Sequence, residues 1–378
     1  MVLVFIIGYF AIALEHNIKV DKAATALFIG AATWTVYVFG ADSILNVDLS
    51  LSVNEILKSG TPLLENLKAY FLDNKSYESL GDTSILNHFI VHELEHHLVE
   101  ISEILFFLLG AMTIVELIDA HEGFSVITKK IKTTKKVTLI WLLCSIAFFF
   151  SAVLDNLTTA IVMSALLKKL ISDKKDIWLF GGMIVIAANA GGAWSPIGDV
   201  TTIMLWIGGQ ITAANTVVKV FGPSMICMIV PLIVFSFTQK GYITSPESDD
   251  DDDDNPITEK QRNIIFGLGV GALLFVPIFK TVTHLPPFMG ILFGLSILWI
   301  VTEIMHRDKS SRDRKEYSVI GVLTKIDVPS VLFFLGILAA VASLQSAGQL
   351  NQLALFLDNS LGDNFGVDGK IYALNIII

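Results

Sequence analysis

The chain has 378 residues, of which 53% are hydrophobic and only 16% are charged. A water-soluble protein of this length needs a larger charged fraction to cover its surface, so the composition excludes that class and predicts an integral membrane protein. The formal net charge of -10 says little about partners, because much of it comes from the acidic run at 249–254. We expect the partners to be the lipid bilayer and the transported ions, and no nucleic acid.

Apolar stretches of membrane-spanning length recur along the chain. They predict helices near 1–14, 23–40, 98–118, 177–212, 216–238, 263–280, 285–304 and 326–346, with a further stretch at 137–171 that polar residues interrupt. The acidic segment 41–97 is poor in Lys and Arg and is expected outside the cytoplasm. We therefore expect an all-α polytopic membrane protein, multi-pass in the plasma (inner) membrane.

A His/Glu cluster precedes and enters the span at 98–118. Its first part, HELEH (92–96), matches the H-E-x-x-H pattern of zinc proteases, although no third metal ligand is evident. We expect a hydrated outer face, and the alternatives are a pH-sensing group near an ion entrance and an intramembrane zinc protease. The residues concerned are His92, His96, His97, Glu100 and Glu103. Glu116 and Asp119, at the other end of the span, form interfacial ion pairs or an exit pathway.

The stretch at 137–171 has lysine clusters at both ends, so both ends should face the cytoplasm. It is either a re-entrant hairpin or a tightly turned helix pair with Asp155 at its tip. A helix break in lipid frees backbone groups and gathers oxygen ligands suited to a small cation. The residues proposed there are Asp155, Asn156, Thr158 and Thr159. The alternative is a polar helix cap.

A second interruption lies inside the span at 177–212, where glycines and Pro196 break the helix. The polar residues that line this break are Asn189, Ser195, Asp199, Thr201 and Thr202. The alternative is a Gly/Pro hinge with a solvated aspartate. Such a hinge would need Asp199 to reach water from an apolar segment that continues to Trp206.

The two aspartates, Asp155 and Asp199, predict a secondary transporter rather than an enzyme or a channel. Desolvation favours the protonated carboxyl group, and a bound Na+ favours the carboxylate, so H+ and Na+ compete for one site. Exposing that site alternately to the two sides gives antiport. No cofactor is expected beyond the transported Na+ or Li+ and H+. A carrier of anions such as dicarboxylate, citrate or arsenite is the alternative, which two acidic interruptions disfavour.

The chain also indicates an inverted repeat, because SEILFFLLGAMTIVEL (102–117) is similar to PSVLFFLGILAAVASL (329–344) in the opposite predicted orientation. The expected domains are a first repeat at 1–240, an acidic cytoplasmic linker at 241–262, and a second repeat at 263–378. The second repeat is expected to be truncated before its own hairpin tip.

Four segments carry a resemblance to a known family: 13–27, 103–124, FSAVLDNLTTAIVM (150–163) and 187–215. In them the chain resembles the NhaD-type Na+/H+ antiporters of the ion transporter superfamily. The resemblance implies sodium and lithium export in exchange for protons. It also implies a fold like that of dicarboxylate and citrate carriers, a homodimer and elevator-type movement. Its site motifs fall on the residues of the two interruptions, on His96, His97, Glu100 and Glu103, and on Glu116 and Asp119.

Overall fold

The computed structural model describes residues 1–46, 50, 53, 83–125, 131, 133–207, 209–244, 257–307, 309 and 317–356. All named elements in these ranges are helices, and the one β-bridge, between Lys135 and Tyr242, is isolated. Most of the predicted outer segment 41–97, the acidic run and the last residues of the chain lie outside the described residues.

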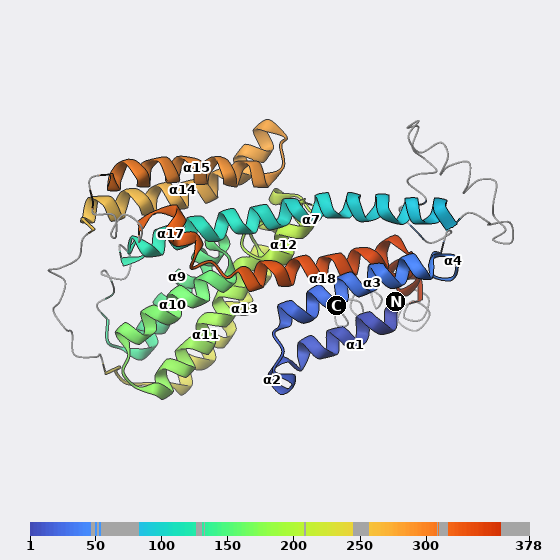
Figure 1. Ribbon diagram of the computed structural model, residues 1–378. Coiled ribbons are helices and arrows are strands. Elements are labelled where there is room, and N and C mark those ends of the chain that lie inside the picture. The colour runs from blue at the N-terminus through green and yellow to red at the C-terminus, as the bar shows by residue number, and fades with distance from the viewer. Residues whose placement is uncertain are drawn as a thin grey trace. The chain divides into compact units, whose positions relative to one another are not determined.

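Fourteen helices are named in the described ranges (Figure 1). They are α1 (Val2–Ala13), α2 (Glu15–Ile18), α3 (Lys22–Phe39), α4 (Ala41–Ile44), α7 (Thr83–Ala120), α9 (Lys136–Leu154), α10 (Asn156–Leu170), α11 (Lys174–Ala193), α12 (Val200–Ile207), α13 (Ala213–Thr238), α14 (Glu259–Thr283), α15 (Pro287–His306), α17 (Val319–Leu323) and α18 (Val328–Ser346). Eight of these helices are long and apolar enough to cross a membrane. The expected all-α polytopic architecture is confirmed.

Two predicted helix starts were wrong. The span expected to begin at 98 belongs to α7, which begins at Thr83. The span expected to begin at 263 is α14, which begins at Glu259 because Thr258 and Gln261 form a reciprocal capping box there. The starts were predicted too late because the spans were placed by hydropathy, and polar side chains near both true starts lower it.

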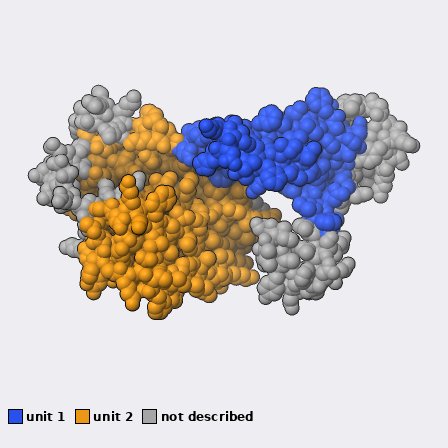
Figure 2. All heavy atoms as spheres, turned by 90° about the horizontal axis from the view of Figure 1, so that it is seen from below, with its two compact units in different colours: residues 1–105, 327–378 blue, residues 106–326 orange. Residues whose placement is uncertain are grey.

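The first of two compact units comprises residues 1–105 and 327–378 (Figure 2). Its helices α3 and α18 approach closely through Gly30 and Gly336, where added Cβ atoms would overlap the backbone of the other helix. The indole Nε1 of Trp34 donates to the carbonyl oxygen of Ala339 at 2.8 Å. Small residues that let two helices touch are typical of packing in lipid, so this pair forms the core of the unit.

The second unit comprises residues 106–326. Helices α9, α10, α11 and α13 form a bundle around the buried side chains of Leu143, Phe148, Phe180 and Leu232 (Figure 1). Helices α14 and α15 pack as an antiparallel pair joined by a short turn at 284–286. These units do not test the predicted repeats, and the division at 1–240, 241–262 and 263–378 stays a prediction.

The stretch at 137–171 folds into two helices, and its two ends bind the same short segment at 241–244. The segment that follows α13 binds the start of the pair, because Lys136 N donates to Gly241 O at 3.1 Å and Ile243 N donates to Thr134 O at 2.8 Å. The same segment accepts from the far end, where Ser172 N donates to Thr244 O at 3.0 Å. Helices α9 and α10 thus form a hairpin that turns at Asp155, and whether this hairpin is re-entrant or crosses the membrane stays a prediction.

Candidate ion site

The break between α9 and α10 is a single residue, Asp155. Its backbone has φ 75° and ψ 160°, a region that is populated almost only by glycine and costs about 1–3 kcal/mol for other residues. The Asp155 carbonyl accepts from Thr159 N at 3.2 Å and so begins α10. The chain therefore reverses sharply at the residue that was predicted to be the tip, and a non-glycine side chain is held there against backbone preference.

The second break separates α11, which ends at Ala193, from α12, which begins at Val200. Glycines in and before the break press against the hairpin: a Cβ on Gly191 would overlap the carbonyl of Phe148, and a Cβ on Gly198 would overlap that of Ser151. Two hydroxyl groups tie the same surfaces together. Ser151 Oγ donates to the Ala188 carbonyl, and Ser195 Oγ donates to the Ala152 carbonyl.

Ser151 was missed by the sequence interpretation, because a single serine inside an apolar helix carries no local signal of its partner. Ser195 was predicted as an ion ligand, but its hydroxyl hydrogen points to a backbone carbonyl of α9. Both serines hold the broken helix against the hairpin. The two predicted interruptions therefore pack on one another.

One side-chain amide joins the two breaks. Asn156 Nδ2 donates to Asn189 Oδ1 at 2.9 Å and to Asp199 Oδ2 at 2.8 Å. The other carboxylate oxygen, Asp199 Oδ1, accepts from the backbone N and the hydroxyl of Thr201, each at 2.9 Å. Residues from the start of α10, the last turns of α11 and the start of α12 thus meet in one polar cluster, here called the Asn156 cluster: Asn156, Asn189, Asp199 and Thr201.

The oxygens of the Asn156 cluster are arranged for an electropositive partner. Asn189 Nδ2 donates a hydrogen bond to the Val185 carbonyl oxygen at 2.8 Å. This bond orients the amide so that Asn189 Oδ1 faces the Asn156 amide. Rotating the Asn156 amide by half a turn would exchange its nitrogen for its oxygen. Three oxygens from three elements would then converge, which is the kind of ligand set that a small hard cation takes.

Asp155 lies beside this cluster in an apolar setting. It lines a small cavity of about 10 Å³, roughly the space of one water molecule. The other residues that line the cavity are Phe107, Leu108, Ala111, Met112, Val153, Leu154, Ile197, Ile203 and Leu273. Its carboxyl group is therefore in the kind of surroundings where a charge needs compensation.

Three further threonines were predicted as ion ligands, and none has a described hydrogen bond to the Asn156 cluster. Thr159 is fully buried and its hydroxyl has no hydrogen-bond partner among the described residues. Thr202 is buried on α12. The Thr158 side chain lies outside the described part of the chain. Their assignment as ion ligands stays a prediction.

The His/Glu cluster on α7 lies on two faces of the helix: the side chains of His96 and Glu100 are more than half exposed, as expected, whereas those of Glu93 and His97 are buried. Glu93 and His97 are only 3% and 6% exposed, because α7 extends well before the predicted start and packs this face inside the first unit. His97 Nδ1 lies 3.2 Å from Glu100 Oε2, and His96 Nε2 lies 3.7 Å from Glu100 Oε1. Within the described residues no three His, Cys, Asp or Glu side chains could hold a metal ion, so the geometry does not support the zinc-protease alternative.

The other predicted members of this helix are Glu103, one turn beyond Glu100, and Glu116 near its far end. Glu116 interacts electrostatically with Asp119 and with Lys325, which follows α17. The choice between interfacial ion pairs and an exit pathway for Glu116 and Asp119 stays a prediction.

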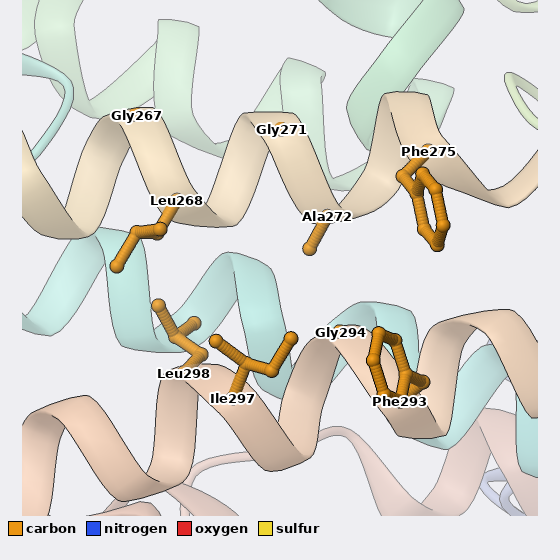
Figure 3. Close-up of a pocket in the computed structure, with 9 residues that line it drawn as sticks. All are labelled: Gly267, Leu268, Gly271, Ala272, Phe275, Phe293, Gly294, Ile297 and Leu298. Carbon is orange, nitrogen blue, oxygen red and sulfur yellow. The ribbon is translucent and has the colours of Figure 1, made fainter.

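A larger cavity, of about 330 Å³, lies between α14 and α15 (Figure 3). Its lining is apolar, with Leu268 opposite Leu298 and Phe275 opposite Phe293. No charged, amide or hydroxyl side chain lines it. This cavity is unsuited to an ion, and no residue of the Asn156 cluster lines it.

The family of the chain follows from comparison with known proteins. Residues 3–378 match the sequence pattern of the citrate transporter family. The chain belongs to this family. It is 41% identical over 361 residues to sodium/proton antiporter 1 of Arabidopsis thaliana, with 96% of this chain and 55% of that protein covered. For sodium/proton antiporter 2 of the same plant the identity is 38%, with 95% and 74% covered.

The Na+/H+ antiporter NhaD of Vibrio cholerae is 29% identical over 305 residues, which cover 74% of this chain and 62% of that protein. The resemblance to NhaD-type antiporters is therefore confirmed. The chain spans little more than half the length of the first Arabidopsis relative. Family and relatives are transporters, in agreement with the expected class.

Proposed function

We propose that the chain carries out secondary Na+(Li+)/H+ antiport, exporting sodium or lithium in exchange for protons. The observation that carries this proposal is the pair of oxygens, Asn189 Oδ1 and Asp199 Oδ2, that face one amide nitrogen between the two breaks. The names of the plant and bacterial relatives support the same function. The proposed membrane is the plasma membrane, and the proposed assembly is a homodimer.

Competition between ions explains the exchange. A carboxylate away from bulk water needs a compensating charge, which either a proton or a metal ion can supply. Asp199 and Asp155 are the two carboxyl groups at the breaks. When Na+ binds, it supplies the charge and the proton leaves; when a proton returns on the other side, Na+ loses its ligand and leaves. Uptake of one ion therefore requires release of the other.

The Asn156 amide can serve the site in two orientations. In the arrangement described, its Nδ2 hydrogens satisfy both facing oxygens. On Na+ binding, the amide rotates and presents Oδ1, and it gives up its local bond from Leu157 N, now 2.9 Å long. The amide then serves as a third oxygen ligand, with Asn189 and Asp199 as the others.

An anion carrier is the second candidate, suggested by the description of the family. The Asn156 cluster argues against it, because the groups that face the amide nitrogen are oxygen acceptors that would repel an anionic substrate. Measuring exchange with citrate and with Na+ in the same vesicles separates the two candidates.

The test uses the protein in sealed vesicles that contain a pH-sensitive dye, with Na+, Li+ or K+ added after a proton gradient is set. We expect Na+ and Li+ to dissipate the gradient in the wild type. Asp155→Asn and Asp199→Asn should each abolish this exchange, since asparagine keeps the shape and the helix-capping oxygen but cannot hold either ion by charge.

Asp173→Asn is the matched control. Asp173 caps α11 by accepting from Lys175 N at 2.9 Å, as Asp199 caps α12, but it lies outside the cluster. It should exchange ions like the wild type. Full exchange by Asp199→Asn would refute the proposed site, and exchange of citrate without any response to Na+ would refute the proposed function.

A further inference from the structure

The short helix α12 begins at the candidate site, and a lysine from another helix contacts its far end. Asp199 caps its first turn through Thr201 N, and its last turn ends at Trp206 and Ile207. At that end the side chain of Lys280, from α14, donates through Nζ to the Trp206 carbonyl oxygen at 3.0 Å. The same nitrogen lies 4.3 Å from the centre of the Trp206 ring.

These contacts are directional. The carbonyl groups in the last turn of a helix have no partner within the helix and carry partial negative charge, which a cation stabilises. The ring face of tryptophan attracts a cation as well. Trp206 is only 4% exposed, so the ring is fixed by its surroundings. One ammonium group thus holds the carbonyl and the ring of a single residue, which fixes both the end and the rotation of α12.

Anchoring at the membrane surface is the simpler role for a lysine near a helix end, since Lys280 stands three residues before the end of α14. That role would turn the ammonium toward water and away from the protein. Instead Nζ is directed at the end of another helix. The contact joins α14 to the helix that Asp199 caps, and Asp199 in turn accepts from Asn156 of α10.

We infer that Lys280 is a positioning residue for the ion site: it holds the far end of α12 and thereby fixes Asp199 at the near end. An eight-residue helix is about 12 Å long and rigid on that scale, so a tilt at Trp206 displaces Asp199 relative to Asn156. Displacements of about 1 Å are enough to impair a site of this kind. This inference rests on the proposed function for its transport readout, but not for its structural one.

The transport test compares Lys280→Met, Lys280→Arg and Lys219→Met. Methionine removes the charge at similar length, while arginine can still hold both the carbonyl and the ring. Lys219 is an exposed lysine two turns into α13, the helix that follows α12, and serves as the matched control. We expect Lys280→Met to raise the Na+ concentration for half-maximal exchange about tenfold. The other two variants should stay within about twofold of the wild type.

A second readout does not depend on exchange. Thr201→Cys, in a chain that also carries Cys144→Ala and Cys227→Ala, places a thiol beside Asp199 that N-ethylmaleimide can label. We expect Lys280→Met to change the labelling rate at least about threefold, and Lys219→Met to leave it unchanged. If the wild type fails to exchange Na+, the proposed function fails, while the labelling rate still tests the placement of α12.

Where Lys280→Met does not fold, Trp206→Phe and Trp206→Leu replace it. Phenylalanine keeps an aromatic face and should retain the wild-type labelling rate, whereas leucine should change it by the same factor expected of Lys280→Met. The inference is overturned if Lys280→Met or Trp206→Leu leaves the rate and the half-maximal Na+ concentration at wild-type values. It is also overturned if Lys219→Met changes them as much.

Discussion

His121 Nε2 lies 2.8 Å from His306 Nε2, and both side chains are buried in the second unit. His121 Nδ1 donates to the Leu117 carbonyl at 2.7 Å, so in the neutral ring Nε2 is an acceptor and His306 must donate to it. The pair therefore connects the end of α7 to the end of α15 in one tautomeric arrangement. Burial lowers the pKa of His121 below its ordinary value, the hydrogen bond to Leu117 opposes this, and the positive charge of Lys309 adds to it.

The histidine pair predicts a loss of stability in acid. A histidine whose pKa is lowered by folding stabilises the protein above its unfolded pKa of about 6.5, and this contribution is lost as the pH falls toward the folded value, by at most about 1.4 kcal/mol per pH unit. We expect the unfolding temperature in detergent to fall between about pH 7 and pH 5. His121→Gln should lower it at neutral pH, because it breaks the connection, and should flatten its dependence on pH.

His284→Gln is the control, since His284 is an exposed histidine that ends α14. It should keep both the unfolding temperature and its pH dependence. An equally steep pH dependence in His121→Gln would show that other groups are responsible.

The backbone of Asp155 predicts that replacing it by glycine raises the stability of the protein while it abolishes exchange. Glycine adopts φ 75° and ψ 160° without the cost of about 1–3 kcal/mol that other residues bear there. Both Asp155→Gly and Asp155→Asn should abolish Na+/H+ exchange, but only Asp155→Gly relieves the backbone. We expect Asp155→Gly to unfold at a higher temperature than Asp155→Asn. Equal unfolding temperatures would contradict the conformation described here.

The contact of α11 with the hairpin predicts that Gly191 tolerates no side chain. Gly191→Ala would place a methyl group on the Phe148 backbone and should cost about 1–3 kcal/mol. Gly182→Ala, nine residues earlier on the same helix, meets open space and should be neutral or stabilising by up to about 1 kcal/mol. Comparing unfolding temperatures of the two variants in detergent checks the prediction, which fails if they agree.

A parallel prediction concerns the first unit, where Gly336 of α18 touches the backbone of α3. A Cβ there would overlap Ala26 and Leu27, so Gly336→Ala should separate the two helices and lower the unfolding temperature. Gly271→Ala, which meets open space on α14, is the control. An alanine that is tolerated equally at both positions would contradict the close packing of α3 and α18.

The sequence predicted the interruptions but not their partners. Asp155 and the Gly/Pro run at 191–198 were recognisable because polar and helix-breaking residues stand out in apolar stretches. That Asn156 would donate to both Asn189 and Asp199 depends on how three elements pack, and no local pattern encodes it. The hydrogen bond from Ser195 to the backbone of α9 was equally hidden, because its partner lies 43 residues away in the sequence.

The burial of Glu93 and His97 was unpredictable for a related reason. Hydropathy averaged over the His/Glu cluster placed it outside the span, yet α7 continues through it. Lys280 was equally hidden, because a lysine near the end of an apolar helix is typical of surface anchoring. Its partner on α12 is 74 residues away in the sequence.

The segment at 241–244 has a mechanical consequence for the hairpin. Because it clamps the beginning of α9 and the residue just beyond α10 by backbone hydrogen bonds, the two legs are prevented from splaying apart where they start. In the proposed antiport we therefore expect α9, α10 and the end of α13 to move together, with bending around the tip.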